Sequence, residues 1–136
     1  MKCRLLVFLL LSFGSLAALA KDPASTILLH PGDVVYARYE QKGTKLKFIS
    51  ASKTVDEHAQ LILSLDRADP VKKDPITFKI VNKFALDLKG KKEMRVLSIG
   101  FFSPTDSVHV VAERISLEKI PAFVEELAVF GFELEK

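Results

Sequence analysis

The sequence has almost no cysteine and no tryptophan. Its single cysteine among 136 residues is Cys3, so an intrachain disulfide is excluded and a zinc or iron–sulfur site built on several thiolates is not available. The lack of tryptophan, with only two tyrosines, argues against a sugar-binding platform, which relies on exposed aromatic faces. The fold must therefore be stabilised by a hydrophobic core rather than by covalent links.

Long hydrophobic runs are also lacking, apart from one at the N-terminus. A run of roughly 16 apolar or small residues, 5–20, follows the basic residues Lys2 and Arg4 and ends in Ala18-Leu19-Ala20. This layout predicts a signal peptide over 1–20 cleaved after Ala20, because the run falls short of the roughly 20 residues that span a bilayer. The alternative is an uncleaved membrane anchor. We expect a flexible leader over 21–25 and a single β-sandwich domain over 26–136.

A strong charge of either sign is missing once this segment is removed. Loss of Lys2 and Arg4 lowers the formal net charge from +3 to +1, and nucleic-acid binding normally needs a strongly cationic surface. We therefore expect no nucleic-acid partner, and membrane contact only through an uncleaved signal peptide. We expect a periplasmic or extracellular location. A cysteine-free exported domain fits a bacterial periplasm or cell surface, because small animal secreted domains tend to be rich in disulfides.

What the sequence does have is apolar alternation with a period of two, which predicts half-buried strands. The residues expected to face the core are Val35, Ala37 and Tyr39; Leu46 and Phe48; Ala59, Leu61, Leu63 and Leu65; Ile76, Phe78 and Ile80; Leu97, Ile99 and Phe101; Val108 and Val110; and Ala128, Phe130, Phe132 and Leu134. Glycine and proline punctuate these runs. Lys42-Gly43 and Lys89-Gly90-Lys91 are predicted turns, and Pro70 and Pro75 mark a loop.

Short strands with turn signals about every ten residues are typical of an all-β fold. We expect an antiparallel β-sandwich of about seven to eight strands, immunoglobulin-like or jelly-roll-like. One segment is ambiguous, because Ile120, Phe123, Val124 and Leu127 also fit helical spacing. A short helical turn near 117–125 is the alternative there.

No arrangement of residues points to catalysis. The three histidines, His30, His58 and His109, do not come with enough nearby ligands to predict a metal site. The sequence has no G-x-S-x-G nucleophile motif and no glycine-rich phosphate loop. We therefore expect a protein that is not an enzyme and that needs no cofactor or metal.

Two groups of residues are candidate contact sites. Phe101 and Phe102 are neighbours in a predicted strand, so they face opposite ways, and one of them could form an outer apolar patch with Tyr36. The second group is a basic hairpin tip that could touch an anionic surface. Its residues are Lys89, Lys91, Lys92 and Arg95.

These observations favour an exported, non-enzymatic module for protein binding or assembly, which would contact another protein through a sheet face or a strand edge. The alternative is a small carrier that holds a hydrophobic, lipid-like molecule in an interior lined with phenylalanine and tyrosine. A packed interior with an outer apolar patch would favour the module, and a continuous cavity would favour the carrier.

Overall fold

The computed structural model describes residues 25–67, 71, 75–96 and 105–136, and these form strands and turns without a helix. The strands are β1 (Ile27–Leu29), β2 (Val34–Lys42), β3 (Lys45–Ser52), β4 (Leu61–Arg67), β5 (Ile76–Asn82), β6 (Asp87–Arg95), β7 (Thr105–Val110), β8 (Ile115–Ile120) and β9 (Glu126–Glu135). The predicted all-β class is confirmed. The predicted signal peptide and residues 21–24 of the leader lie outside the described residues.

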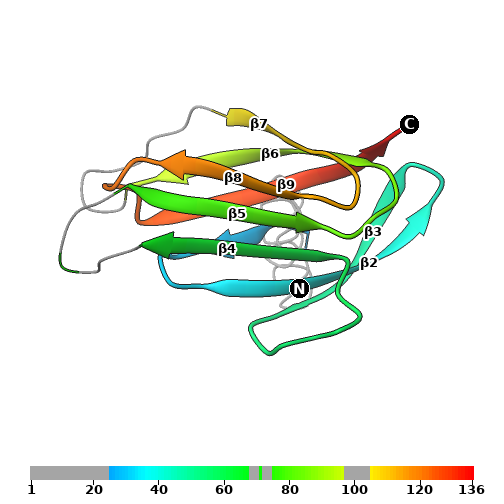
Figure 1. Cartoon of the computed structure of the whole chain (residues 1–136), viewed down its shortest axis with the longest axis horizontal. Coiled ribbons are helices and arrows are strands. Elements are labelled where there is room, and N and C mark those ends of the chain that lie inside the picture. Colours follow the sequence, from blue (N-terminus) through cyan, green and yellow to red (C-terminus); the bar gives the residue numbers. More distant parts are fainter. Residues whose placement is uncertain (1–24, 68–70, 72–74, 97–104) are drawn as a thin grey trace, which may run out of the picture.

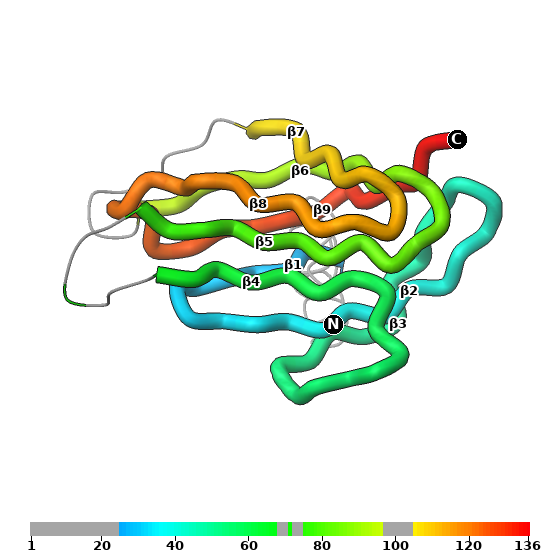
Figure 2. Tube along the Cα trace, viewed as in Figure 1, coloured from blue at the N-terminus to red at the C-terminus, as the bar shows by residue number. Residues whose placement is uncertain are grey.

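All strand pairs are antiparallel and belong to one sheet, in the order β7-β6-β9-β3-β2-β4-β5-β8, with β1 paired to β9. This sheet curls into a nearly closed barrel, in which β8, β5, β4 and β2 form the front wall and β6 and β9 lie behind (Figures 1 and 2). The predicted sandwich of two separate sheets is wrong, and no immunoglobulin-like or jelly-roll-like assignment follows from it. The walls are joined at one corner, where Lys45 pairs with Glu133 and the Leu134 N–H donates to the Thr44 carbonyl at 2.8 Å.

The barrel interior is built by the predicted alternation. In β2, β4 and β5 the expected inward residues are all buried, and Leu46 and Phe48 of β3 pack against them. Val108 and Val110 of β7 are also buried. Because antiparallel neighbours keep their inward residues in register, side chains of different strands meet in one hydrophobic core. The inward positions predicted at Leu97, Ile99 and Phe101 lie outside the described residues.

The turn predicted at Lys89-Gly90-Lys91 is wrong, because these residues lie within β6 between β7 and β9. Gly90 faces the interior, where an added Cβ would stand 2.7 Å from a ring carbon of Phe132. Glycine is needed here because another side chain packs directly on the backbone, and a turn is not involved.

A β-bulge changes the predicted inward face of β9. The register between β6 and β9 shifts opposite Gly90, where Gly131 adopts a φ of 65°. The extra residue reverses the alternation, so that Leu127 and Val129 precede the bulge on the core side and Phe132 and Leu134 follow it. The inward face is therefore predicted correctly for Phe132 and Leu134 and wrongly for Ala128 and Phe130, which do not join the core cluster, although Ala128 is buried.

Two further predictions concern local turns. Gly43, with a φ of 62°, and Thr44 connect β2 to β3 in a tight hairpin closed by the Lys42–Lys45 pair, as the glycine there predicts. The helical turn near 117–125 is not confirmed. β8 continues to Ile120, and a single turn follows in which the Val124 N–H donates to the Pro121 carbonyl at 3.1 Å.

Candidate functional site

Of the three predicted contact residues, only Tyr36 is among the described residues, and Phe101 and Phe102 lie outside them. Tyr36 lies on β2 between the buried residues Val35 and Ala37, so its side chain points to the outer face of the barrel, where it is half-buried. The outer position predicted for Tyr36 is therefore confirmed.

Tyr36 begins an apolar row that crosses the outer face of the front wall. It pairs with Ile62 of β4, Ile62 pairs with Val81 of β5, and Val81 pairs with Ile115 of β8. Residues paired in this way place their side chains next to one another on one face. We call Tyr36, Ile62, Val81 and Ile115 the outer apolar row. Sequence reasoning missed its last three members, although apolar residues at positions that the alternation assigns to solvent were a usable signal.

The row ends at β8, where two large apolar side chains are exposed. Ile115 is 56% exposed and Leu117, two residues along the same face, is 67% exposed. Scattered exposed apolar residues need no explanation, but apolar residues along a strand edge are a feature that soluble proteins usually avoid. This end of the outer apolar row is therefore the first candidate contact surface.

Among the described strands, β8 pairs only with β5, and β7 pairs only with β6. The Asn82 N–H donates to the Arg114 carbonyl at 2.9 Å. Residues with even numbers in this stretch therefore direct their backbone N–H and C=O groups to β5. Because these groups alternate in direction along an antiparallel strand, those of Ile115 and Leu117 point to the other, free edge. Of the described strands, β7 and β8 are therefore the two ends of the main strand order, and β1, which pairs only with β9, is a third strand with a single neighbour.

The two edges flank a groove of about 340 Å³, which we call the β7–β8 groove. Its lining comes from both edge strands and from the interior face of β5, with residues Phe78, Ile80, Ser107, Val108, His109, Ser116, Leu117 and Glu118. Among the described residues, no strand pairing joins β7 to β8, so the barrel is open along this groove. In the front wall, backbone hydrogen bonds join each strand to the next.

A buried charge lies beside the groove. Lys92 points from β6 into the barrel, with a side chain only 2% exposed, and its ammonium group forms an ion pair with Glu118 of β8. The Glu118 side chain is 48% exposed. The pair thus connects the back wall to the edge strand of the front wall, and the carboxylate remains accessible from the groove.

The four residues of the predicted basic tip do not form one cationic surface. Lys92 is the buried lysine just described, and Arg95 is partly buried with its guanidinium 2.9 Å from Glu126. Lys89 lies 3.6 Å from carboxylate oxygens of both Glu133 and Glu135. Neighbouring carboxylates offset most of this positive charge, and the residues are spread along a strand.

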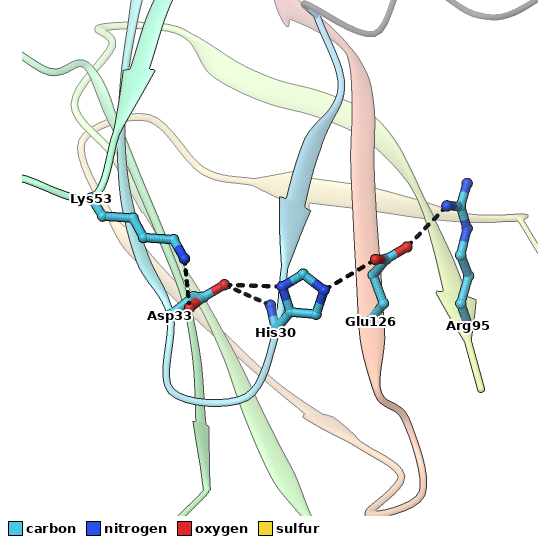
Figure 3. Close-up of polar contacts among 5 residues, drawn as sticks. All are labelled: His30, Asp33, Lys53, Arg95 and Glu126. Carbon is cyan, nitrogen blue, oxygen red and sulfur yellow. Dashed lines mark hydrogen bonds and ion pairs between the residues drawn. The ribbon is translucent and has the colours of Figure 1, made fainter. Parts of the chain in front are cut away.

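A polar network lies at the end of the barrel where β1 turns into β2 (Figure 3). His30 lies between two carboxylates, with Nδ1 3.3 Å from Asp33 and Nε2 3.1 Å from Glu126. Lys53 extends the network from Asp33, and Arg95 extends it from Glu126. The His30 ring lies between the two carboxylates, and each carboxylate also meets a lysine or an arginine, so the network ties the β1–β2 turn to β6 and β9.

Contacts in this network lower the pKa of Asp33. Partial burial alone would raise it, but the His30 backbone N–H, the Lys53 ammonium and the His30 ring outweigh that effect. An Asp–His pair of this kind can orient a proton acceptor, but nucleophilic catalysis also needs a hydroxyl or thiol beside the imidazole, and the five side chains of the network supply neither. Within the described part of the chain, no group of three or more histidine, cysteine, aspartate or glutamate side chains is placed to hold a metal ion.

The corner of the barrel near β3 is filled by aromatic rings. Tyr39 meets Phe48, Phe84 and Phe132 edge-on, at centroid distances of 5.7, 6.4 and 6.1 Å. Burial raises the pKa of the Tyr39 hydroxyl. These rings fill the part of the barrel interior next to β3.

Comparison with known proteins returns no matching family model, no similar curated protein and no similar solved structure. Over the described residues, no helix is long and apolar enough to cross a membrane.

Proposed function

We propose that this chain is an exported, non-enzymatic module for protein binding and assembly, working in the periplasm or at the cell surface. Its contact site is the free edge of β8 together with the outer apolar row, and its partner contributes an extended strand. The observation that carries the proposal is that Ile115 and Leu117 combine exposed apolar side chains with backbone groups directed to a free edge.

Strand addition explains both features at once. A partner strand laid along β8 would satisfy the outward-directed N–H and C=O groups of Ile115 and Leu117, and backbone hydrogen bonds of this kind supply affinity in such complexes. Alternate side chains of the partner would cover the apolar side chains. Natural proteins usually protect a long apolar edge, so an edge left open in this way is consistent with a binding site.

The carrier hypothesis receives less support. The aromatic rings around Tyr39 fill one part of the interior. The lining of the β7–β8 groove mixes apolar side chains with polar ones, among them Glu118, which is ion-paired with Lys92. A lipid-like ligand needs an apolar pocket that covers most of its surface.

Site-specific photo-crosslinking tests the proposal. A photoreactive phenylalanine analogue replaces Leu117 in the full chain, and a matched variant carries it at Ile49 of β3, which is 58% exposed and lies outside the outer apolar row. After irradiation in the producing cells, the Leu117 variant should give one discrete protein adduct, identified by mass spectrometry, that the Ile49 variant lacks. Equal adducts at both positions, or none at Leu117, would overturn the proposal.

A further inference from the structure

We infer that the partner of β8 is a second copy of this chain, whose own β8 pairs antiparallel with the first across a two-fold axis. The inference rests on the proposed function and names the partner. It follows from the order of side chains along β8, which is complementary to itself when the strand is reversed.

In an antiparallel pair of identical strands, the residue numbers of any two facing residues add up to the same value. When Ser116 faces Ser116 of the other copy, Ile115 faces Leu117 and Arg114 faces Glu118. The register therefore pairs apolar with apolar on the outer face and cation with anion on the inner face. Cross-strand pairs of both kinds stabilise a sheet.

Neighbouring registers lack this match. One step towards the C-terminal end brings Leu117 opposite Leu117 but Ile115 opposite Lys119, and one step the other way brings Ile115 opposite Ile115 but Leu117 opposite Glu113. Both steps separate Arg114 from Glu118, and a second step towards the C-terminal end places Glu118 opposite Glu118. Like charges directly opposite one another destabilise a sheet. Charge complementarity thus selects the register centred on Ser116.

The backbone supports the same arrangement. Ile115 and Leu117 direct their N–H and C=O groups to the free edge, because the Arg114 carbonyl is already bonded to Asn82 of β5. In the proposed register these two residues form hydrogen-bonded pairs with Leu117 and Ile115 of the other copy. Ser116 then occupies a non-hydrogen-bonded pair, where side chains lie closest together.

The side chains of the inner pair are available for it. Arg114 is exposed directly before β8, and Glu118 keeps a 48% exposed side chain while paired with Lys92. A carboxylate can accept from two cations. An arginine of the second copy would therefore add to the ion pair beside the β7–β8 groove and leave it intact.

Pairing of this kind also continues the sheet. β8 ends the front wall beside β5 (Figure 1), so the wall of one copy would run through the two β8 strands into the wall of the other. The outer apolar row would then continue from Ile115 onto Leu117 of the second copy. The result is a symmetric dimer in which the same patch is used twice.

A cysteine at the symmetry centre tests the register. Facing Cα atoms in a non-hydrogen-bonded pair are about 4.5 Å apart, within the roughly 4.4–6.8 Å range of disulfides. In the full chain carrying Cys3→Ser, the Ser116→Cys variant should form a disulfide-linked dimer under mild oxidation. The control is Ser64→Cys, a half-buried serine on β4, which should stay unlinked.

Sedimentation of variants without engineered cysteines tests the contacts. The unmodified protein should dimerise reversibly. Arg114→Glu should weaken self-association by about tenfold, because two opposite-charge pairs become like-charge pairs, and the association of the unmodified chain should weaken as salt increases. Leu117→Lys should abolish the dimer, since lysine on an edge strand opposes pairing.

The outcomes separate this inference from the proposed function. A monomer at all concentrations, or Ser116→Cys linking no better than Ser64→Cys, overturns the second copy as partner. Efficient linking at Leu117→Cys in place of Ser116→Cys overturns the register and with it the charge argument. If the Leu117 photo-crosslink then joins a different protein, the binding module stands without self-assembly, whereas no crosslink at all removes both.

Discussion

The front wall at β2, β4 and β5 and the β7–β8 groove use the same alternating pattern but differ in what their inward positions hold. In the wall, every strand has two hydrogen-bonded neighbours, and inward positions such as Leu63 are fully buried and apolar. At the groove, the edge strands have one described neighbour each, and the inward positions include Glu118 and the tip of Lys92.

In this barrel, an inward carboxylate is found where the described strands have one neighbour each. Where the sheet is continuous, water is excluded, and the inward side chains are apolar or, like Asn82 of β5, hydrogen-bonded to backbone groups. Where it is open, an inward carboxylate can keep part of its hydration, which lowers the cost of burying the lysine that it binds. The inward charge is therefore compatible with the open line between the described strands β7 and β8.

The largest effect should come from the front wall. Leu63→Ala removes a fully buried side chain at a position where strands on both sides hold the backbone in place, so the cavity cannot collapse. We expect the free energy of unfolding to fall by about 2–5 kcal/mol. Chemical denaturation measures it, and a loss below about 1 kcal/mol would contradict the tight packing described for the wall.

The next largest change in stability should differ between the two residues of the buried ion pair, Lys92 and Glu118. Glu118→Gln leaves the Lys92 ammonium buried without its counter-charge, and we expect a loss of about 1–3 kcal/mol. Lys92→Met leaves a half-exposed carboxylate that can be hydrated, and removes the buried charge, so stability should be unchanged or higher. Denaturation of both variants side by side makes the comparison, and a more destabilising Lys92→Met would show that the groove is not the accessible end of the pair.

Within the filled interior, the Tyr39 hydroxyl provides a smaller test. This oxygen is buried and has no hydrogen-bond partner among the described atoms, and an unsatisfied buried hydroxyl costs free energy. Tyr39→Phe keeps the edge-on ring contacts and should stabilise the fold by about 1 kcal/mol. Thermal unfolding gives the sign, and a clear loss of stability would mean that the hydroxyl is bonded.

How much of this difference between the front wall and the β7–β8 groove the sequence predicts depends on whether the contacts involved are between residues close together in the chain. Alternation in β2, β4 and β5 identifies their inward residues, because each strand of the wall shows its period within its own sequence. The turn predicted at Lys89-Gly90-Lys91 is wrong, because these residues lie within β6. Gly90 indicates a turn locally, but its reason is a Phe132 ring from a strand about forty residues away, and Lys92 is buried only because Glu118 lies across the barrel.

The candidate site shows the same limit. Tyr36 could be placed on the outer face from its neighbours, but the outer apolar row needs the registers of three strand pairs, none of which is visible in one strand. Among the described strands β8 has a single neighbour, β5, and this depends on how strands distant in the sequence pair, so no local pattern reveals it. The bulge at Gly131 reverses the inward face within a single strand, which an uninterrupted alternation cannot anticipate.

The smallest change in stability should come from replacing Leu117, which lines the β7–β8 groove. Leu117→Thr replaces a 67% exposed leucine on an edge strand by a residue that suits strands equally well. In dilute protein the free energy of unfolding should therefore change by no more than about 0.5 kcal/mol, against the several-fold larger loss at Leu63. The measurement is repeated over a range of protein concentrations, because a second copy that covers Leu117 would stabilise the unmodified chain more at high concentration than the variant. A large loss that is independent of concentration would instead mean that Leu117 is buried within its own chain, and the contrast between the wall and the groove would disappear.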